Sequence, residues 1–173
     1  MGELEKIANA KAHASGREII ERLRGEMEAF HRQQSARQML RSGATIINSQ
    51  ALCARGLEDQ GKAIAAHFEW VIEEGLWTSQ SLVDSLVGEA RTHLEPVLDA
   101  SRDLMRMATD RARSPALLVR SIAELETVRD KVWTNTDLAL RAVAAQKKRR
   151  GIRSVWRSVV GWASKLFGLS RGA

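Results

Sequence analysis

The sequence predicts an all-α protein: an elongated antiparallel helical bundle, or a coiled-coil-like body, followed by a C-terminal amphipathic helix. Three observations support this fold class. Good helix formers fill most of the 173 residues, and there are only two prolines, Pro96 and Pro115. Apolar residues recur at steps of three and four along almost the whole chain. Positive charge is concentrated at the C-terminal end. We therefore divide the chain into a helical body, residues 1–146, and a basic tail, residues 147–173.

The stretch from Leu4 to Leu76 contains no proline and keeps helical spacing throughout. One helix of that length would measure about 110 Å, so we expect a break. The candidate places are Gly16, the polar segment 31–35 and the neighbourhood of Ser42 and Gly43. The second half has a face of small residues, which favours close helix approach, with larger ones between them: Ala44, Ala51, Ala54, Gly61 and Ala65, with Ile47, Phe68 and Ile72.

Gly75 provides a stop signal, and Thr78 and Ser79 supply an N-cap for the next helix, which we expect from about residue 81 to residue 113. Pro96 lies in its interior and predicts a kink or a break. The predicted buried side consists of Leu82, Leu86, Ala90, Leu94, Val97, Ser101, Leu104 or Met105, and Ala108.

Ser114 and Pro115 begin the last long helix, because serine caps well and proline is favoured in the first turn. From Leu125 to Ala142 the apolar rhythm is seven residues, which is typical of a coiled coil. Asn135 falls at an inward position of that rhythm, where a buried amide would fix the register or the oligomeric state. The alternative is that Asn135, with Thr136, faces water at the edge of the stripe.

The charge of the chain is unevenly distributed. Residues 1–140 carry 18 basic and 21 acidic side chains, whereas residues 141–173 carry 9 basic and none acidic. The last acidic residue is Asp137, and the run Lys147, Lys148, Arg149 and Arg150 introduces the tail. Such an end is attracted to membrane headgroups or to nucleic-acid phosphates.

Advancing 100° per residue from Ile152 separates the tail into two halves. Tryptophans on the apolar half and arginines on the polar half are the composition of a helix that lies in a lipid interface. The tail is too often interrupted by charge to span a bilayer. The predicted surface-binding residues are Lys147, Lys148, Arg149, Arg150, Ile152, Arg153, Val155, Trp156, Arg157, Val159, Val160, Trp162, Leu166, Phe167 and Leu169.

Two other interpretations of the tail remain open. Its apolar half can fold back onto the bundle, as most amphipathic helices do. Alternatively, residues 147–153 can track phosphates while Trp156 or Trp162 stacks on bases. An ordered apolar arc favours a lipid-like surface, because phosphate binding does not require one.

The sequence carries no recognisable catalytic chemistry. Its glycines are dispersed along helical sequence rather than gathered in a phosphate-binding loop. The four histidines, His13, His31, His67 and His93, lack metal-binding spacing, and the lone Cys53 is expected to be a small buried side chain. We therefore expect no enzyme, no cofactor and no small-molecule substrate. A single cysteine and the absence of an apolar leader indicate a cytoplasmic protein.

Two stretches resemble bacterial phasins. One runs from Ala51 through Glu58 to His67-Phe68-Glu69, and the other from Ala112 to Pro115, continuing into Leu118, Ile122, Glu124 and residues 139–142. Phasins are small helical proteins that coat polyhydroxyalkanoate granules. The resemblance implies a non-enzymatic, self-associating coat on a hydrophobic inclusion.

These expectations lead to one main hypothesis, a cytoplasmic and oligomeric helical protein attached by its tail to a polyester granule or to the inner leaflet of the membrane. The alternatives are a nucleoid or RNA-binding helical protein that uses the same basic residues, and an assembly subunit of a larger protein complex.

Overall fold

A computed structural model of the protein describes residues 2–75 and 78–168, with side chains described up to Arg150. Four helices follow one another: α1 (Glu3–Ala36), α2 (Gly43–Glu74), α3 (Gln80–Arg111) and α4 (Ala116–Gly168). No strand occurs in these residues. The predicted all-α bundle is therefore confirmed.

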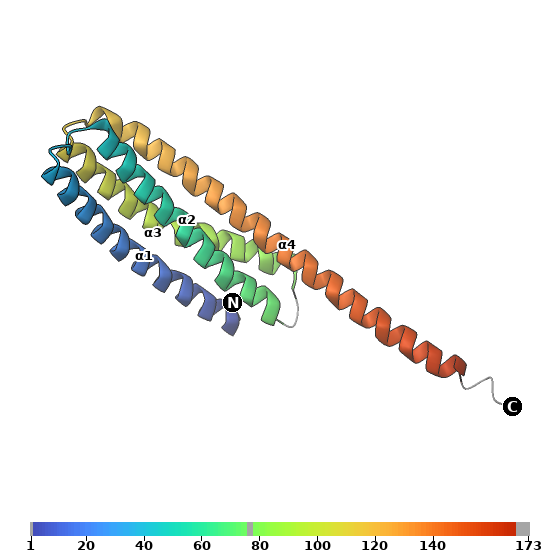
Figure 1. Ribbon diagram of the computed structural model, residues 1–173. Helices are drawn as coiled ribbons and strands as arrows, with labels where there is room; N and C mark the ends of the chain where they lie inside the picture. Colours follow the sequence, from blue (N-terminus) through green and yellow to red (C-terminus); the bar gives the residue numbers. More distant parts are fainter. Residues whose placement is uncertain (1, 76–77, 169–173) are drawn as a thin grey trace.

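The four helices alternate in direction and form an elongated bundle in which α2 and α3 lie between α1 and α4 (Figure 1). Helix α2 contacts each of the other three, whereas no contact joins α1 to α4 in the described part of the chain. The two central helices accordingly bury the most side chains. The turns 37–42 and 112–115 lie together at one end, which we call the tip (Figure 1).

Local capping chemistry sets most helix boundaries. Ser42 Oγ accepts a hydrogen bond from Thr45 N at 3.2 Å, and Ser79 Oγ accepts one from Leu82 N at 3.1 Å. Helix α2 ends at Glu74, and Gly75 is its C-cap. Of the predicted break points, the one near Ser42 is right. Gly16 and the whole of segment 31–35 lie inside α1.

Helices α1 and α3 end in the same way. Gln38 and Arg113, with φ of 57° and 55°, take the left-handed conformation that usually falls to glycine at this position. In each case the next amide reaches back to close the last turn, from Met39 N to Gln34 O and from Ser114 N to Thr109 O, both at 2.9 Å. These paired bonds satisfy carbonyls that the helix end leaves free.

The predicted buried side of α3 is confirmed, apart from a half-buried Leu82. Pro96 is exposed and does not break the helix, which is continuous from Gln80 to Arg111. Its ring faces solvent rather than the core, and the carbonyl of the exposed Thr92, which loses its helical partner, is on the same side of the helix as water.

Over its first turns, α2 buries a different side of the helix from the one that the sequence predicts. Ala44, Ile47 and Ala51 are exposed, and Ile47 is 67% accessible. Two polar residues are buried instead, because their hydroxyls have partners: Thr45 Oγ1 donates to Met39 O at 2.9 Å, and Ser49 Oγ lies 3.2 Å from His31 Nε2. Hydrogen bonding removes most of the cost of burying a hydroxyl.

The predicted seven-residue rhythm of α4 holds only from Leu125 to Val132, which are both buried, and fails after that. The buried positions are Ser121, Leu125, Val132, Thr136 and Leu140, while Ala142 is exposed. Ser121 and Val132, like Leu125 and Thr136, are 11 residues apart. A nearly straight helix has 3.6 residues per turn and drifts about 20° per heptad, so the buried stripe moves away from a strict seven-residue pattern.

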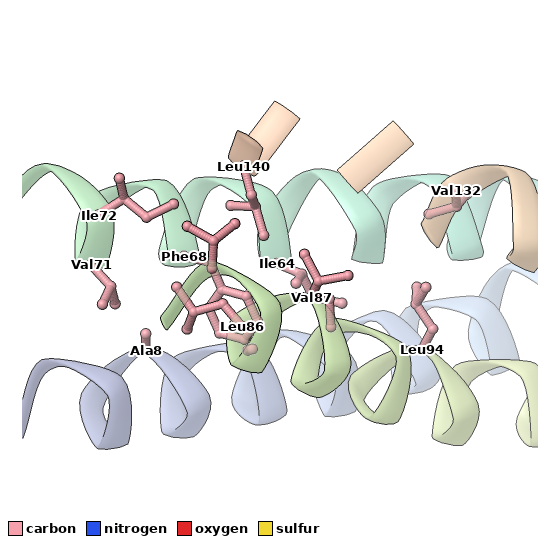
Figure 2. Packing of buried hydrophobic residues seen from close by; sticks show 13 residues of the cluster. Ala8, Ile64, Phe68, Val71, Ile72, Leu86, Val87, Leu94, Val132 and Leu140 are labelled. Carbon is pink, nitrogen blue, oxygen red and sulfur yellow. The ribbon is translucent and has the colours of Figure 1, made fainter. Parts of the chain in front are cut away.

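The core consists of two clusters along the bundle, and the half-buried Val128 packs against both. Near the end opposite the tip, Phe68 of α2, Leu86 of α3 and Leu140 of α4 come together (Figure 2). Nearer the tip, Leu23, Leu57 and Leu98 belong to a second cluster. Close helix approach at small residues is confirmed at Gly61, where a Cβ would meet Val132 Cγ1 of α4 at 2.2 Å.

Candidate surface-binding helix

Helix α4 is longer than the bundle. It runs beside α2 and α3 and then continues past them, away from the tip (Figure 1). Lys147 is the residue at which α4 meets the last turn of α2. From there the helix continues to Gly168, which at 1.5 Å per residue is about 30 Å. The backbone therefore presents a helical extension of the kind that the sequence predicts for the tail.

Lys147 itself belongs to the bundle rather than to the extension. Its Nζ donates to the carbonyl oxygens of Ile72 at 2.5 Å and Glu73 at 3.0 Å, and to that of Gly75. The last carbonyls of a helix lack intrahelical partners and carry its negative dipole end, so an ammonium group stabilises them. Lys147 thus caps α2, and a role for it in surface binding stays a prediction. In the sequence nothing distinguishes it from its basic neighbours.

The next three residues, Lys148, Arg149 and Arg150, are exposed. No ion pair with them occurs among the side chains that the structure describes. The remaining predicted residues have their side chains outside the described part, so the separation into apolar and basic faces stays a prediction. These are Ile152, Arg153, Val155, Trp156, Arg157, Val159, Val160, Trp162, Leu166 and Phe167, which lie within α4, and Leu169 beyond it.

The end of the bundle from which α4 emerges is acidic. Residues 69–74 at the end of α2 and 80–89 at the beginning of α3 carry five carboxylates and no lysine or arginine: Glu69, Glu73, Glu74, Asp84 and Glu89. Of these, Asp84 pairs with Arg141 of α4 at 3.0 Å. The basic extension thus begins beside negative charge. Any anionic surface that it contacts must be held away from these carboxylates.

Asn135 does not occupy the inward position predicted for it. It is exposed, and the neighbouring Thr136 is buried at 4% accessibility. Asn135 lies at an open groove between α2 and α4, whose lining includes Gly61, Lys62, Val132 and Ala139. It is therefore not a buried amide within one chain, and a role in the register of an oligomer stays a prediction.

Cys53 is fully buried, as predicted. Burial raises the pKa of its thiol to about 11, so the thiol is protonated at neutral pH. Its Sγ donates to Ser101 O across the α2–α3 contact at 3.8 Å.

His31 joins three helices near the tip. Arg111 Nη1 of α3 donates to its Nδ1 at 2.9 Å, so the ring is neutral and its Nε2–H donates to Ser49 Oγ of α2. Burial, with a smaller contribution from the Arg111 charge, holds the pKa of His31 below its ordinary 6.5. The pKa values of His67 and His93 are lowered as well, chiefly by burial.

Within the described residues, no three His, Cys, Asp or Glu side chains come together as a metal site would require. The same residues include no helix long and apolar enough to cross a membrane. Comparison with protein-family models, with curated proteins and with solved structures finds no match.

Proposed function

We propose that the chain is a non-enzymatic helical protein that attaches to a hydrophobic or anionic surface in the cytoplasm through residues 148–169. The observation that carries this proposal is the extension of α4, a helix about 30 Å long beyond Lys147 with three exposed cations at its start. Its sequence separates an aromatic, apolar half from a basic half, which is the pattern of interfacial helices.

The length of the extension separates basic residues of the tail from the carboxylates at the end of α2. Electrostatic interactions decay over about 8 Å at physiological salt. A helix that extends about 30 Å from the bundle therefore places Arg157 and Lys165 well beyond the field of Glu73 and Glu74, whereas Lys148, Arg149 and Arg150 begin within it. The body can then remain at a distance from the surface while the tail binds it.

Two surfaces fit this chemistry. The resemblance to phasins favours a polyhydroxyalkanoate granule, and the inner leaflet of the membrane is the alternative within the same class. On either surface we propose that the chain self-associates, and that the groove beside Asn135 forms the contact between copies.

Microscopy of a fluorescent fusion, with and without polyester accumulation, tests the proposal. The informative deletion removes residues 148–173 and keeps Lys147, so that α2 retains its cap. We expect the truncated protein to become diffuse while its thermal unfolding stays cooperative. Localisation that is unchanged by the deletion would refute the proposal.

A nucleic-acid-binding function is the second candidate, because Lys148, Arg149 and Arg150 are exposed cations that phosphates would attract equally well. The salt dependence of binding distinguishes nucleic-acid binding from lipid binding. Affinity for nucleic acid falls steeply as salt rises. Insertion into lipid shifts the fluorescence of Trp156 and Trp162 to the blue and persists in part at high salt.

A further inference from the structure

The tip of the bundle combines strong positive charge with exposed apolar side chains. Two segments distant in sequence meet there, residues 32–47 around the α1–α2 turn and residues 106–120 around the α3–α4 turn (Figure 1). Together these segments carry seven arginines and a single carboxylate, Asp110. Residues 1–140 as a whole carry more acidic than basic side chains, so the tip is a local concentration of positive charge.

Four of these arginines are available to a partner: Arg32, Arg37, Arg41 and Arg113. All four are exposed, and none belongs to an ion pair in the part of the chain that the structure describes. The other three arginines are engaged within the bundle.

Those three bond to neighbouring residues. Arg106 pairs with Asp103 at 2.8 Å and Arg120 with Glu124 at 2.9 Å. Arg111 donates to His31 of α1, which fixes the end of α3 beside that of α1. The structure therefore distinguishes arginines that hold the tip together from arginines that face outward.

Apolar exposure is concentrated at the same end. The described chain has seven exposed large apolar side chains, and five of them lie in the two turns or within about one helical turn of them. Val119 is 78% exposed and Met39 is 48% exposed. The other three are Ile47, Met107 and Leu117. Clustered exposed apolar residues mark interaction sites more often than scattered ones do.

We propose that the tip is a second contact for anionic lipid, separate from the tail. Arginines suit phosphate headgroups, and each basic residue at an anionic leaflet strengthens binding. The neighbouring apolar side chains suit the acyl boundary beneath the headgroups. Phosphates of a nucleic acid would be matched by the arginines alone and would leave Val119 and Met39 in water.

The tip acts independently of the tail. Helix α2, with 32 residues, spans about 48 Å between the two ends of the bundle, which is several times the distance over which salt screens charge. Loss of binding at the tip therefore does not affect binding at the tail, and the converse also holds. A molecule with both contacts has two lipid-binding ends joined by a rigid bundle.

Partition of the full chain onto phosphatidylcholine–phosphatidylglycerol vesicles, measured by flotation, tests the tip. The tip variant is Arg37→Gln/Arg41→Gln/Arg113→Gln, and glutamine suits position 113 because Gln38 already takes the same φ in the other turn. Losing about fivefold per arginine, the tip should bind roughly 100-fold more weakly, and this loss is measured in chains that also carry Lys148→Gln/Arg149→Gln/Arg150→Gln, so that the tail contributes least.

The matched control removes the same charge from other parts of the bundle, as Lys6→Gln/Arg17→Gln/Arg55→Gln. These residues are also exposed and outside the described ion pairs, and we expect a change of less than about threefold, because they lie more than a screening length from the tip. An equal loss in the tip and control variants would overturn the proposal. So would a tip variant that partitions normally onto vesicles but no longer binds duplex DNA.

Two further variants complete the test. Met39→Ser/Val119→Ser should lower partition at high salt, where the arginines contribute little, and unchanged partition there would contradict a lipid contact. Lys148→Gln/Arg149→Gln/Arg150→Gln reports on the tail alone. If only this variant loses binding, the tip proposal fails and the proposed function stands. If only the tip variant loses vesicle binding, the proposed function of the tail fails and the tip proposal stands.

Discussion

Replacing Gly61 by alanine perturbs the closest approach between α2 and α4. A Cβ at this position would lie 2.2 Å from Val132 Cγ1, where ordinary contact begins at 3.4 Å. One methyl group must therefore move by about 1 Å. Val132 is 7% exposed, and a valine in a helix has one strongly preferred rotamer, so the side chain cannot simply turn away.

Two opposing effects set the magnitude. Removing a glycine from a helix interior stabilises it by about 1 kcal/mol. Overpacking a well-filled contact costs about 1–3 kcal/mol, and the rigid valine places this site in the upper half of that range. We expect Gly61→Ala to lower the free energy of unfolding by about 1–2 kcal/mol.

Gly88→Ala is the matched control. Gly88 also lies inside a helix, but a Cβ there would meet nothing within 4 Å. The same substitution should therefore stabilise the protein by about 1 kcal/mol, or about 2–4 °C in melting temperature. Urea unfolding followed by circular dichroism measures both variants.

Opposite signs for the two substitutions support the α2–α4 contact, and equal stabilisation would refute it. A double-mutant cycle sharpens the result. If Val132 is the obstacle, the variant Gly61→Ala/Val132→Ala should be more stable than the sum of its single changes by about 1 kcal/mol.

The other predictions concern the ends of the helices. Gln38→Gly and Arg113→Gly should each stabilise the protein by about 1 kcal/mol in thermal melts, because glycine takes a positive φ without strain. Stability should fall as the pH drops below 6.5, because His31, with its lowered pKa, binds a proton more readily in the unfolded chain; His31→Gln should flatten this slope. Lys147→Met should lower the free energy of unfolding by about 1 kcal/mol or more, because three carbonyls at the end of α2 lose their donor, whereas Lys148→Met should leave it unchanged.

Local features of the sequence were sufficient for the fold class and most helix boundaries. Ser42, Ser79 and Gly75 act within a turn of their own positions, so capping rules find them without knowledge of the partners. The buried side of α3 follows from the same local logic. Its apolar residues keep helical spacing, and its two buried polar residues bond within their own helix, Ser101 to Val97 O at 2.7 Å and Thr109 to Met105 O at 2.9 Å.

Which side of α2 is buried, and how the buried residues of α4 are spaced, could not be predicted without the neighbouring helices. Thr45 and Ser49 are buried in α2 because Met39 and His31 supply their partners, and such pairing is invisible when one helix is considered alone. In α4 the observed stripe follows the geometry of a nearly straight helix rather than a supercoil, and a few apolar residues in sequence do not distinguish the two periods.

The candidate binding surfaces divide in the same way. The tail is contiguous, so its charge and its apolar arc can be read directly from residues 147–173. The role of Lys147 and the basic tip depend on segments that meet only after folding: Lys147 lies 72 residues beyond Gly75, and the two halves of the tip are separated by most of α2 and α3. The sequence determines which residues are charged. Where those charges gather depends on which turns and helix ends the bundle brings together.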